Sequence, residues 1–185
     1  MDLSVGTPVD ATPLVIQQAL IAAADAPGYP TTAGTSRLRD SCAGWMQRRL
    51  GVTVPPSAIL PSIGSKELVA ILPTILGLGA DSHVVVPLAA YPTYAVGAGV
   101  LGARVTATDR PEDVPDADLI WINSPGNPTG RVMPVDQMRA IVAHARSTGA
   151  VVASDECYVE LGWDATPCSV HNPFVVGNDH AGDIA

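Results

Sequence analysis

Basic residues, aromatic residues and cysteine are all scarce in this chain. Lysine and arginine together number 10 among the 185 residues, against 18 aspartates and glutamates, which gives a formal net charge of −8. Aromatic residues make up only 4%, and Lys66 is the single lysine. Nucleic acids and anionic membranes bind basic patches, so this charge balance argues against both as partners.

The three cysteines, Cys42, Cys157 and Cys168, are an odd number at unrelated spacings. They predict neither a disulfide framework nor a zinc site, and they favour a reducing, cytoplasmic location. The four histidines are scattered, so no metal site is predicted. The most apolar stretch, residues 68–80, is interrupted by one proline and two glycines and is too short to span a bilayer. We therefore expect a soluble protein.

Hydrophobic residues make up 47% of the chain and charged residues 15%, which is typical of a folded protein with a buried core. Four short runs of apolar or β-branched residues predict buried strands, at 83–86, 104–107, 119–123 and 151–154. A further strand-like piece covers residues 58–60.

Helix-like patterns precede these strands and lie between most of them, at 14–23, 37–50, 65–78, 94–101 and 134–147. Short buried strands that alternate with helices predict a parallel sheet covered on both faces, an α/β fold. Ligands of such sheets bind beyond the carboxyl ends of the strands. The segments expected to form a site are therefore 87–94, 123–130 and 155–158.

Two glycine-containing motifs are poor guides to function. The run GAGVLG at 97–102 has the glycine spacing of a dinucleotide-binding loop, but it closes a predicted helix instead of opening one. We expect it to serve close packing of a helix against the sheet. The Gly-Ser-Lys at 64–66 lacks the earlier glycine and the following Ser or Thr of a nucleotide phosphate loop.

The segments after the strands contain polar residues that could form one ligand-binding site. NSPGNPTG at 123–130 follows a strand, and its prolines and glycines fix an irregular turn that presents Asn127. SDECY at 154–158 ends the next strand and places Asp155 three residues before Tyr158. The chain has five blocks in this order: GYPTTAG followed by Leu38-Arg39, IGSKE at 63–67, PLAAYPTY at 87–94, SPGNPTG at 124–130, and SDECY.

These five blocks resemble, in order and spacing, the large domain of the pyridoxal-phosphate-dependent class I/II aminotransferases of fold type I. The residues of these blocks are most similar to those of actinobacterial succinyldiaminopimelate transaminases of lysine biosynthesis. The resemblance implies a three-layer αβα fold with a mostly parallel sheet, incomplete here, and pyridoxal 5'-phosphate as cofactor. It also implies an N-terminal segment with the first helix at 1–35 and a partial cofactor-binding large domain at 36–185.

The resemblance assigns roles residue by residue. Asp155 matches the acid that pairs with the pyridine nitrogen, and a carboxylate there makes the cofactor an electron sink. Asn127 and Tyr158 match hydrogen-bond partners of the ring oxygen, and Tyr91 matches the aromatic residue stacked on the ring. The remaining matches are Gly64, Ser65 and Lys66 at the phosphate, Tyr29 reaching the phosphate of a second subunit in a homodimer, and Gly6 in the substrate pocket.

One element of the family pattern is missing. A transaminase holds its cofactor as a Schiff base on a lysine, and the resemblance places that lysine a few tens of residues after the SDECY block. Lys66 instead falls in the phosphate block. We therefore expect a fragment of a longer enzyme that lacks the catalytic lysine and the small domain, and that does not transaminate by itself.

Two alternatives to an aminotransferase stay open at this point. A carbon–sulfur lyase uses the same cofactor platform, and the residues that choose between the reactions lie mostly outside these blocks. A non-catalytic module with the same fold is the second alternative. The substrates would be small amino acids and 2-oxo acids, with no nucleic acid or membrane as partner.

Overall fold

The computed structural model describes Gly6 and residues 9–176, so the outer parts of both predicted segments, 1–35 and 36–185, lie outside the described residues. The chain divides into two compact units, Met1–Thr32 and Ala33–Ala185, whereas the sequence predicts a division after residue 35, which stays a prediction. The first unit contains helix α1 (Leu14–Ala22). Within the described part of the chain, no helix is both long and apolar enough to cross a membrane.

The second unit is organised around a parallel sheet of four strands in the order β2-β1-β3-β4. The strands are β1 (His83–Val86), β2 (Arg104–Ala107), β3 (Leu119–Asn123) and β4 (Val151–Asp155). Because β2 lies on one side of β1 and β3 on the other, the chain changes direction across the sheet between β1 and β3. Ligands of open α/β sheets bind at such a point, beyond the carboxyl ends of the strands.

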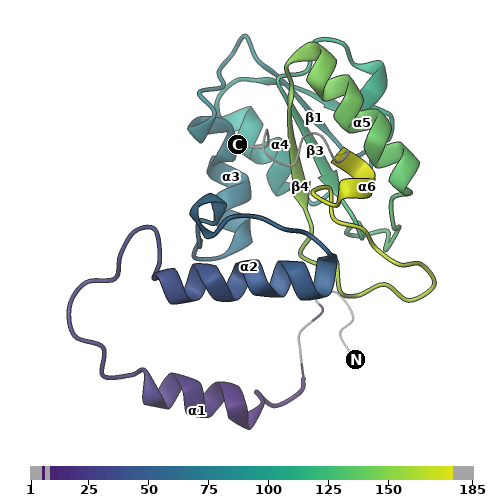
Figure 1. Ribbon diagram of the computed structural model, residues 1–185. Helices are drawn as coiled ribbons and strands as arrows, with labels where there is room; N and C mark the ends of the chain where they lie inside the picture. The colour runs from purple at the N-terminus through teal and green to yellow at the C-terminus, as the bar shows by residue number, and fades with distance from the viewer. Residues whose placement is uncertain (1–5, 7–8, 177–185) are drawn as a thin grey trace. The chain divides into compact units, whose positions relative to one another are not determined.

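Both faces of the sheet are covered by helices (Figure 1). Helix α4 (Thr93–Val100) connects β1 to β2, and α5 (Val135–Thr148) connects β3 to β4. The two connections run in opposite directions across the sheet, and right-handed crossovers then place their helices on opposite faces. Helix α3 (Ser65–Ile75) packs beside α4. The predicted α/β fold with a doubly covered parallel sheet is confirmed.

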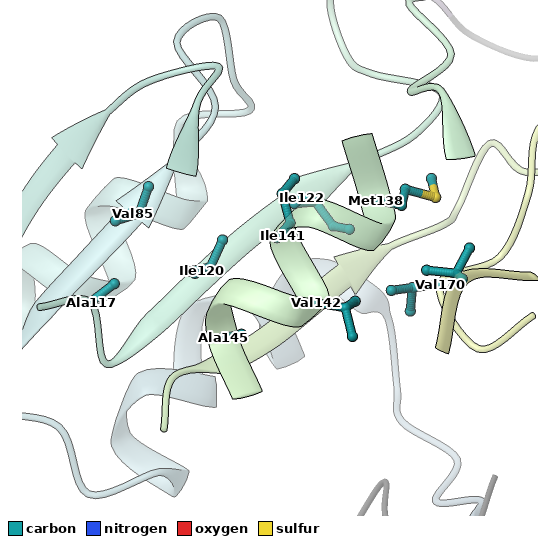
Figure 2. Close-up of a cluster of buried hydrophobic side chains, with 10 residues drawn as sticks. Val85, Ala117, Ile120, Ile122, Met138, Ile141, Val142, Ala145 and Val170 are labelled. Carbon is teal, nitrogen blue, oxygen red and sulfur yellow. The ribbon is translucent and has the colours of Figure 1, made fainter. Parts of the chain in front are cut away.

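Successive residues of the central strands alternate between two separate cores. Figure 2 shows the core on the α5 side, where Val85, Ile120 and Ile122 meet Met138 and Ile141 of α5. The core on the opposite side is formed by residues of the same strands, of α3 and α4, and of the turn before β2: Val69, Val84, Val86, Tyr94, Ala98, Ala103, Leu119 and Trp121. Burial on both faces explains why the sequence runs of the central strands β1 and β3 are almost continuously apolar.

The remaining elements are short or lie before the sheet. Helix α2 (Ser36–Leu50) begins where the Thr35 hydroxyl accepts a hydrogen bond from the Leu38 N–H, and it ends at Gly51, which has a φ of 67°. The other elements are the 3₁₀ helices η1 (Pro56–Ala58) and η2 (Pro111–Asp113) and the helix α6 (Pro173–Val176). The strand-like interpretation of residues 58–60 is wrong. Pro56 fixes a helical φ at the first position of η1, and Ile59 is extended without joining the sheet.

Gly97 is the glycine of the 97–102 run at which a side chain would clash with a neighbouring backbone. A Cβ on Gly97 would lie 2.7 Å from the Ala70 carbonyl oxygen, whereas a Cβ on Gly99 would have nothing within 4 Å. Gly97 does serve close packing, but the expected partner is wrong: Gly97 packs against helix α3 and not against the sheet. Helices α3 and α4 therefore touch through their backbones.

Polar side chains at the amino end of the sheet have hydrogen-bond or ion-pair partners. His83 is 3% exposed, with Nδ1 2.9 Å from Asp116 and Nε2 2.8 Å from the Thr106 hydroxyl. Arg104 also pairs with Asp116. His83 is thus a hydrogen-bonded core histidine, far along the strands from the carboxyl ends.

Candidate cofactor site

A pocket of about 220 Å³ lies at the carboxyl ends of β3 and β4, beside the first turns of α3 and α4. Its volume is below the roughly 300–1,000 Å³ of pockets for drug-sized ligands, so it suits a compact ligand. The residues that line it are Ser65, Lys66, Val69, Tyr91, Tyr94, Asn123, Asn127, Asp155, Cys157 and Tyr158.

The structure brings six of the predicted residues together in this pocket, from four separate segments of the chain. They are Ser65, Lys66, Tyr91, Asn127, Asp155 and Tyr158. Gly64 directly precedes them as the N-terminal cap of α3. Tyr29 and Gly6 belong to the first unit, and their roles stay predictions.

Asp155 is the last residue of β4, and its side chain is held by two donors. The Tyr94 hydroxyl donates to Oδ2 at 2.7 Å, and the backbone N–H of Cys157 donates to Oδ1 at 3.2 Å. The adjacent carboxylate of Glu156 has a different function, since it accepts hydrogen bonds from the Ser154 hydroxyl at 2.9 Å and the Val170 N–H at 2.7 Å. Asp155 therefore serves the pocket, whereas Glu156 ties the strand end to a later segment.

Asn123 connects the two loops that supply the polar groups. Its amide nitrogen donates to the Asp155 carbonyl at 2.9 Å, and its amide oxygen accepts from the Asn127 N–H at 2.7 Å. One side chain thus fixes the end of β4 relative to the turn that carries Asn127. Ser124, which is fully buried, holds the far end of this turn by accepting a hydrogen bond from the Met133 N–H at 2.9 Å.

The first turn of α3 forms the other wall of the pocket. Gly64 adopts a φ of 87°, and no side chain caps the helix there. The N–H groups at a helix start have no partner within the helix and attract anions, an effect that the helix dipole strengthens. Ser65 and Lys66 add a hydroxyl and an ammonium group at the same place, so this wall is suited to an anion such as a phosphate.

Aromatic rings form the floor of the pocket. Tyr94 is 1% exposed, and its ring stacks on Trp121 with centroids 4.8 Å apart and an interplanar angle of 26°. Tyr91 meets Tyr94 edge-on at 6.2 Å and 81°. Burial, and then the hydrogen bond to Asp155, raise the pKa of Tyr94 far above its ordinary value. The Tyr94 hydroxyl therefore stays protonated and remains a donor at physiological pH.

Four pocket residues were given no role from the sequence: Val69, Tyr94, Asn123 and Cys157. Tyr94 lies in the first turn of α4, three residues after Tyr91, which precedes the helix. Asn123 precedes Asn127 by four residues across the turn. Both spacings are visible in the sequence, but the pairing with Asp155 depends on β4 lying next to β3.

A parallel α/β sheet with a pocket of these groups at its carboxyl ends defines a class of protein that binds small polar ligands. The family model for aminotransferase class I and II matches residues 1–180. Together with the fold, this match shows that the chain belongs to the aminotransferase class I and II family, which uses pyridoxal phosphate. The predicted family and its cofactor are confirmed.

Individual relatives agree with this membership. The 4-dedimethylamino-4-oxo-anhydrotetracycline transaminase OxyQ of Streptomyces rimosus is 50% identical over 100% of this chain and 52% of its own length. A probable aminotransferase of Mycobacterium tuberculosis is 54% identical over 100% of this chain and 45% of its own length. The structure of N-succinyldiaminopimelate aminotransferase from Mycobacterium tuberculosis matches with a TM-score of 0.78 and 28% identity, over 90% of this chain and 48% of that one. The chain spans about half the length of the relatives it matches.

Proposed function

We propose that this chain forms the pyridoxal-phosphate platform of an aminotransferase, a protein that moves an amino group between an amino acid and a 2-oxo acid. One observation carries the proposal: four segments, each predicted separately, meet in one pocket with a carboxylate, an amide, two phenols and an uncapped helix start. These groups match the chemistry of a flat, phosphorylated, nitrogen-containing ring.

Each group has a task that its chemistry suits. When bound, the cofactor supplies an electron-withdrawing ring that stabilises negative charge on the substrate α-carbon. The Asp155 carboxylate accepts a hydrogen bond from the protonated ring nitrogen and balances its charge. Asn127 and Tyr158 donate to the ring oxygen, and Tyr91 covers the ring face. Ser65, Lys66 and the N–H groups at the start of α3 hold the phosphate.

Binding of the cofactor is tested directly on this chain. Titration with pyridoxal phosphate should quench tryptophan fluorescence, because Trp121 lies directly beneath Tyr94. Asp155→Asn keeps the shape but removes the charge, and hydrogen bonds to charged groups contribute about 1.5–3 kcal/mol, so the Kd should rise by about 10- to 150-fold.

The matched control is Asp136→Asn, the same chemical change in a side chain that is 91% exposed on α5. It should leave the Kd as it is. Borohydride reduction of the bound sample should leave no cofactor on Lys66, since that residue is assigned to the phosphate. Equal affinity of the wild-type chain and the Asp155 variant, or a reduced adduct at Lys66, would contradict these assignments.

For the substrates, we propose N-succinyl-diaminopimelate and 2-oxoglutarate, in lysine biosynthesis. The similarity of the sequence blocks to succinyldiaminopimelate transaminases supports this pair, as does the match to the Mycobacterium tuberculosis enzyme of that name. The name of the Streptomyces relative points to a tetracycline ketone as the competing substrate. The assay compares N-succinyl-2-amino-6-oxopimelate with that ketone as acceptor, using glutamate, aspartate and aromatic amino donors, on the longest protein that the gene encodes. Preference for the tetracycline ketone would refute the proposed pair.

A homodimer and a cytoplasmic location complete the proposal. The dimer rests on the assignment of Tyr29 to the phosphate of the partner's site. The location rests on the three cysteines, all of which are free of disulfides in the structure.

A further inference from the structure

Tyr94 is the most deeply buried polar side chain of the pocket, and it has no role in the assignments above. Its side chain is 1% exposed, yet its hydroxyl reaches Asp155 Oδ2 at 2.7 Å. The two residues are 61 positions apart and come from different elements, α4 and β4. This hydrogen bond is therefore a tertiary contact between a helix on one face of the sheet and the end of a strand.

The position of the Tyr94 hydroxyl is fixed by the packing of its ring. Trp121 stacks on one face of the ring, Tyr91 lies edge-on to it, and the Tyr94 backbone N–H donates to the Tyr91 carbonyl at 3.3 Å. A ring held in this way has little rotational freedom. The conformational entropy of the hydroxyl is therefore lost when the protein folds and not when a ligand binds.

The carboxylate of Asp155 is held in turn. Tyr94 occupies one lone pair on Oδ2, and the Cys157 N–H occupies one on Oδ1. A carboxylate has about four such positions, so each oxygen keeps room for a further donor. Because both donors are neutral, the negative charge of Asp155 stays available to a cationic partner.

We propose that Tyr94 is a positioning residue that orients Asp155 toward the ring nitrogen of the cofactor. This inference rests on the proposed function and extends it to a residue whose effect is transmitted through Asp155. It yields a selective expectation: loss of the hydroxyl should weaken only ligands that present a ring nitrogen to Asp155.

The test uses Tyr94→Phe, which keeps the stacked ring and removes only the hydroxyl. Its Kd for pyridoxal phosphate should rise by about 3- to 20-fold, less than for loss of the charged group itself. The 1-deaza analogue, in which a C–H replaces the ring nitrogen, should bind the wild-type chain and the variant equally. In an Asp155→Asn background, Tyr94→Phe should have no further effect on the Kd for pyridoxal phosphate.

Val96→Ala is the matched control, because Val96 lies on the same helix and is 58% exposed. It should change neither Kd, and thermal unfolding of each variant verifies that the fold is retained. Equal weakening of both ligands by Tyr94→Phe would reduce Tyr94 to a shape-filling residue, and an unchanged Kd would also overturn the inference. A wild-type chain that does not bind pyridoxal phosphate, or that binds both ligands equally, would instead refute the proposed function.

Discussion

Cys157 shows how the Asp155 carboxylate changes the pKa of a neighbouring side chain. It lies two residues after Asp155 and lines the same pocket. Partial burial, and then the Asp155 carboxylate, raise the pKa of the Cys157 thiol from 9.0 to about 11. The thiolate is the reactive form of cysteine. Although Cys157 is accessible, it should thus be a poor nucleophile at neutral pH.

We predict slow alkylation of Cys157 at pH 8. A rise of about two pKa units lowers the thiolate fraction roughly 100-fold, and the rate should increase with pH until about pH 11. Asp155→Asn should lower the pKa and speed the reaction at pH 8, although only in part, because burial is the larger cause. The measurement is peptide-resolved mass spectrometry after timed iodoacetamide treatment of the cofactor-free chain, with Asp136→Asn as the control. Equal rates for both variants would show that the carboxylate does not act on the thiol.

Residues whose role depends on a strand end could be predicted from the sequence, and residues whose role depends on packing could not. Asp155 ends an apolar run and Asn127 follows one, so the rule that ligands bind beyond strand ends selects the segments that contain them. Their individual roles come from the family resemblance. The role of Tyr94 could not be predicted, because a position in the first turn of a helix does not show what its hydroxyl contacts. Its partner Asp155 becomes visible only when α4 is placed on the correct side of the sheet.

At the scale of elements, the contact of α3 with α4 positions two walls of the pocket at once. Helix α3 carries Ser65 and Lys66, and α4 carries Tyr94. Their close approach depends on the absence of a side chain at Gly97, because a Cβ there would lie 2.7 Å from a carbonyl oxygen. Real Cβ atoms do not approach backbone atoms so closely, so one helix would have to move.

Gly97→Ala should lower the free energy of unfolding by about 1–3 kcal/mol, as overpacking does in other tightly packed interiors. Gly99→Ala is a matched change two residues along the same helix, with nothing within 4 Å of the new Cβ. It should be neutral or stabilising by up to about 1 kcal/mol, since alanine favours helix more than glycine. Urea unfolding of the two variants decides between them, and equal stability would mean that the helices are not in backbone contact.

Most of the elements could be predicted from the sequence, and the errors lie where proline or glycine sets the local geometry. The central strands β1 and β3 are predictable because strands covered on both faces are continuously apolar. The partly exposed strands β2 and β4 are predictable from their β-branched residues, and only the end of β4 differs from the prediction, by one residue, at Asp155. Residues 58–60 have the composition of a strand, but Pro56 begins a 3₁₀ turn just before them. Helix α3 ends at Ile75, before the predicted 78, because Gly77 adopts a φ of 71° that other residues avoid.

For the molecule as a whole, the sheet separates two cores that share the same strands. Val84 and Val85 are neighbours in β1, both 0% exposed, and they face opposite cores. In a sheet with one solvent-exposed face, only one of two neighbouring residues would be buried.

We predict that Val84→Ala and Val85→Ala destabilise the protein by similar amounts, about 1–3 kcal/mol each. The two costs should add when the changes are combined, because the residues have separate neighbours. Chemical denaturation of the single and double variants gives these values. A negligible cost for one valine alone would show that its face of the sheet is not covered.

The pairing of β3 with β4 determines which acidic side chain lines the pocket. Five residue pairs align the strands, from Leu119 opposite Val151 to Asn123 opposite Asp155. Side chains alternate along a strand, so a slip of one residue would exchange the two faces. Asp155 would then turn away from the pocket, and Glu156, with its longer side chain, would take its place. The register of backbone hydrogen bonds between β3 and β4 therefore determines which of two adjacent carboxylates lines the candidate cofactor site.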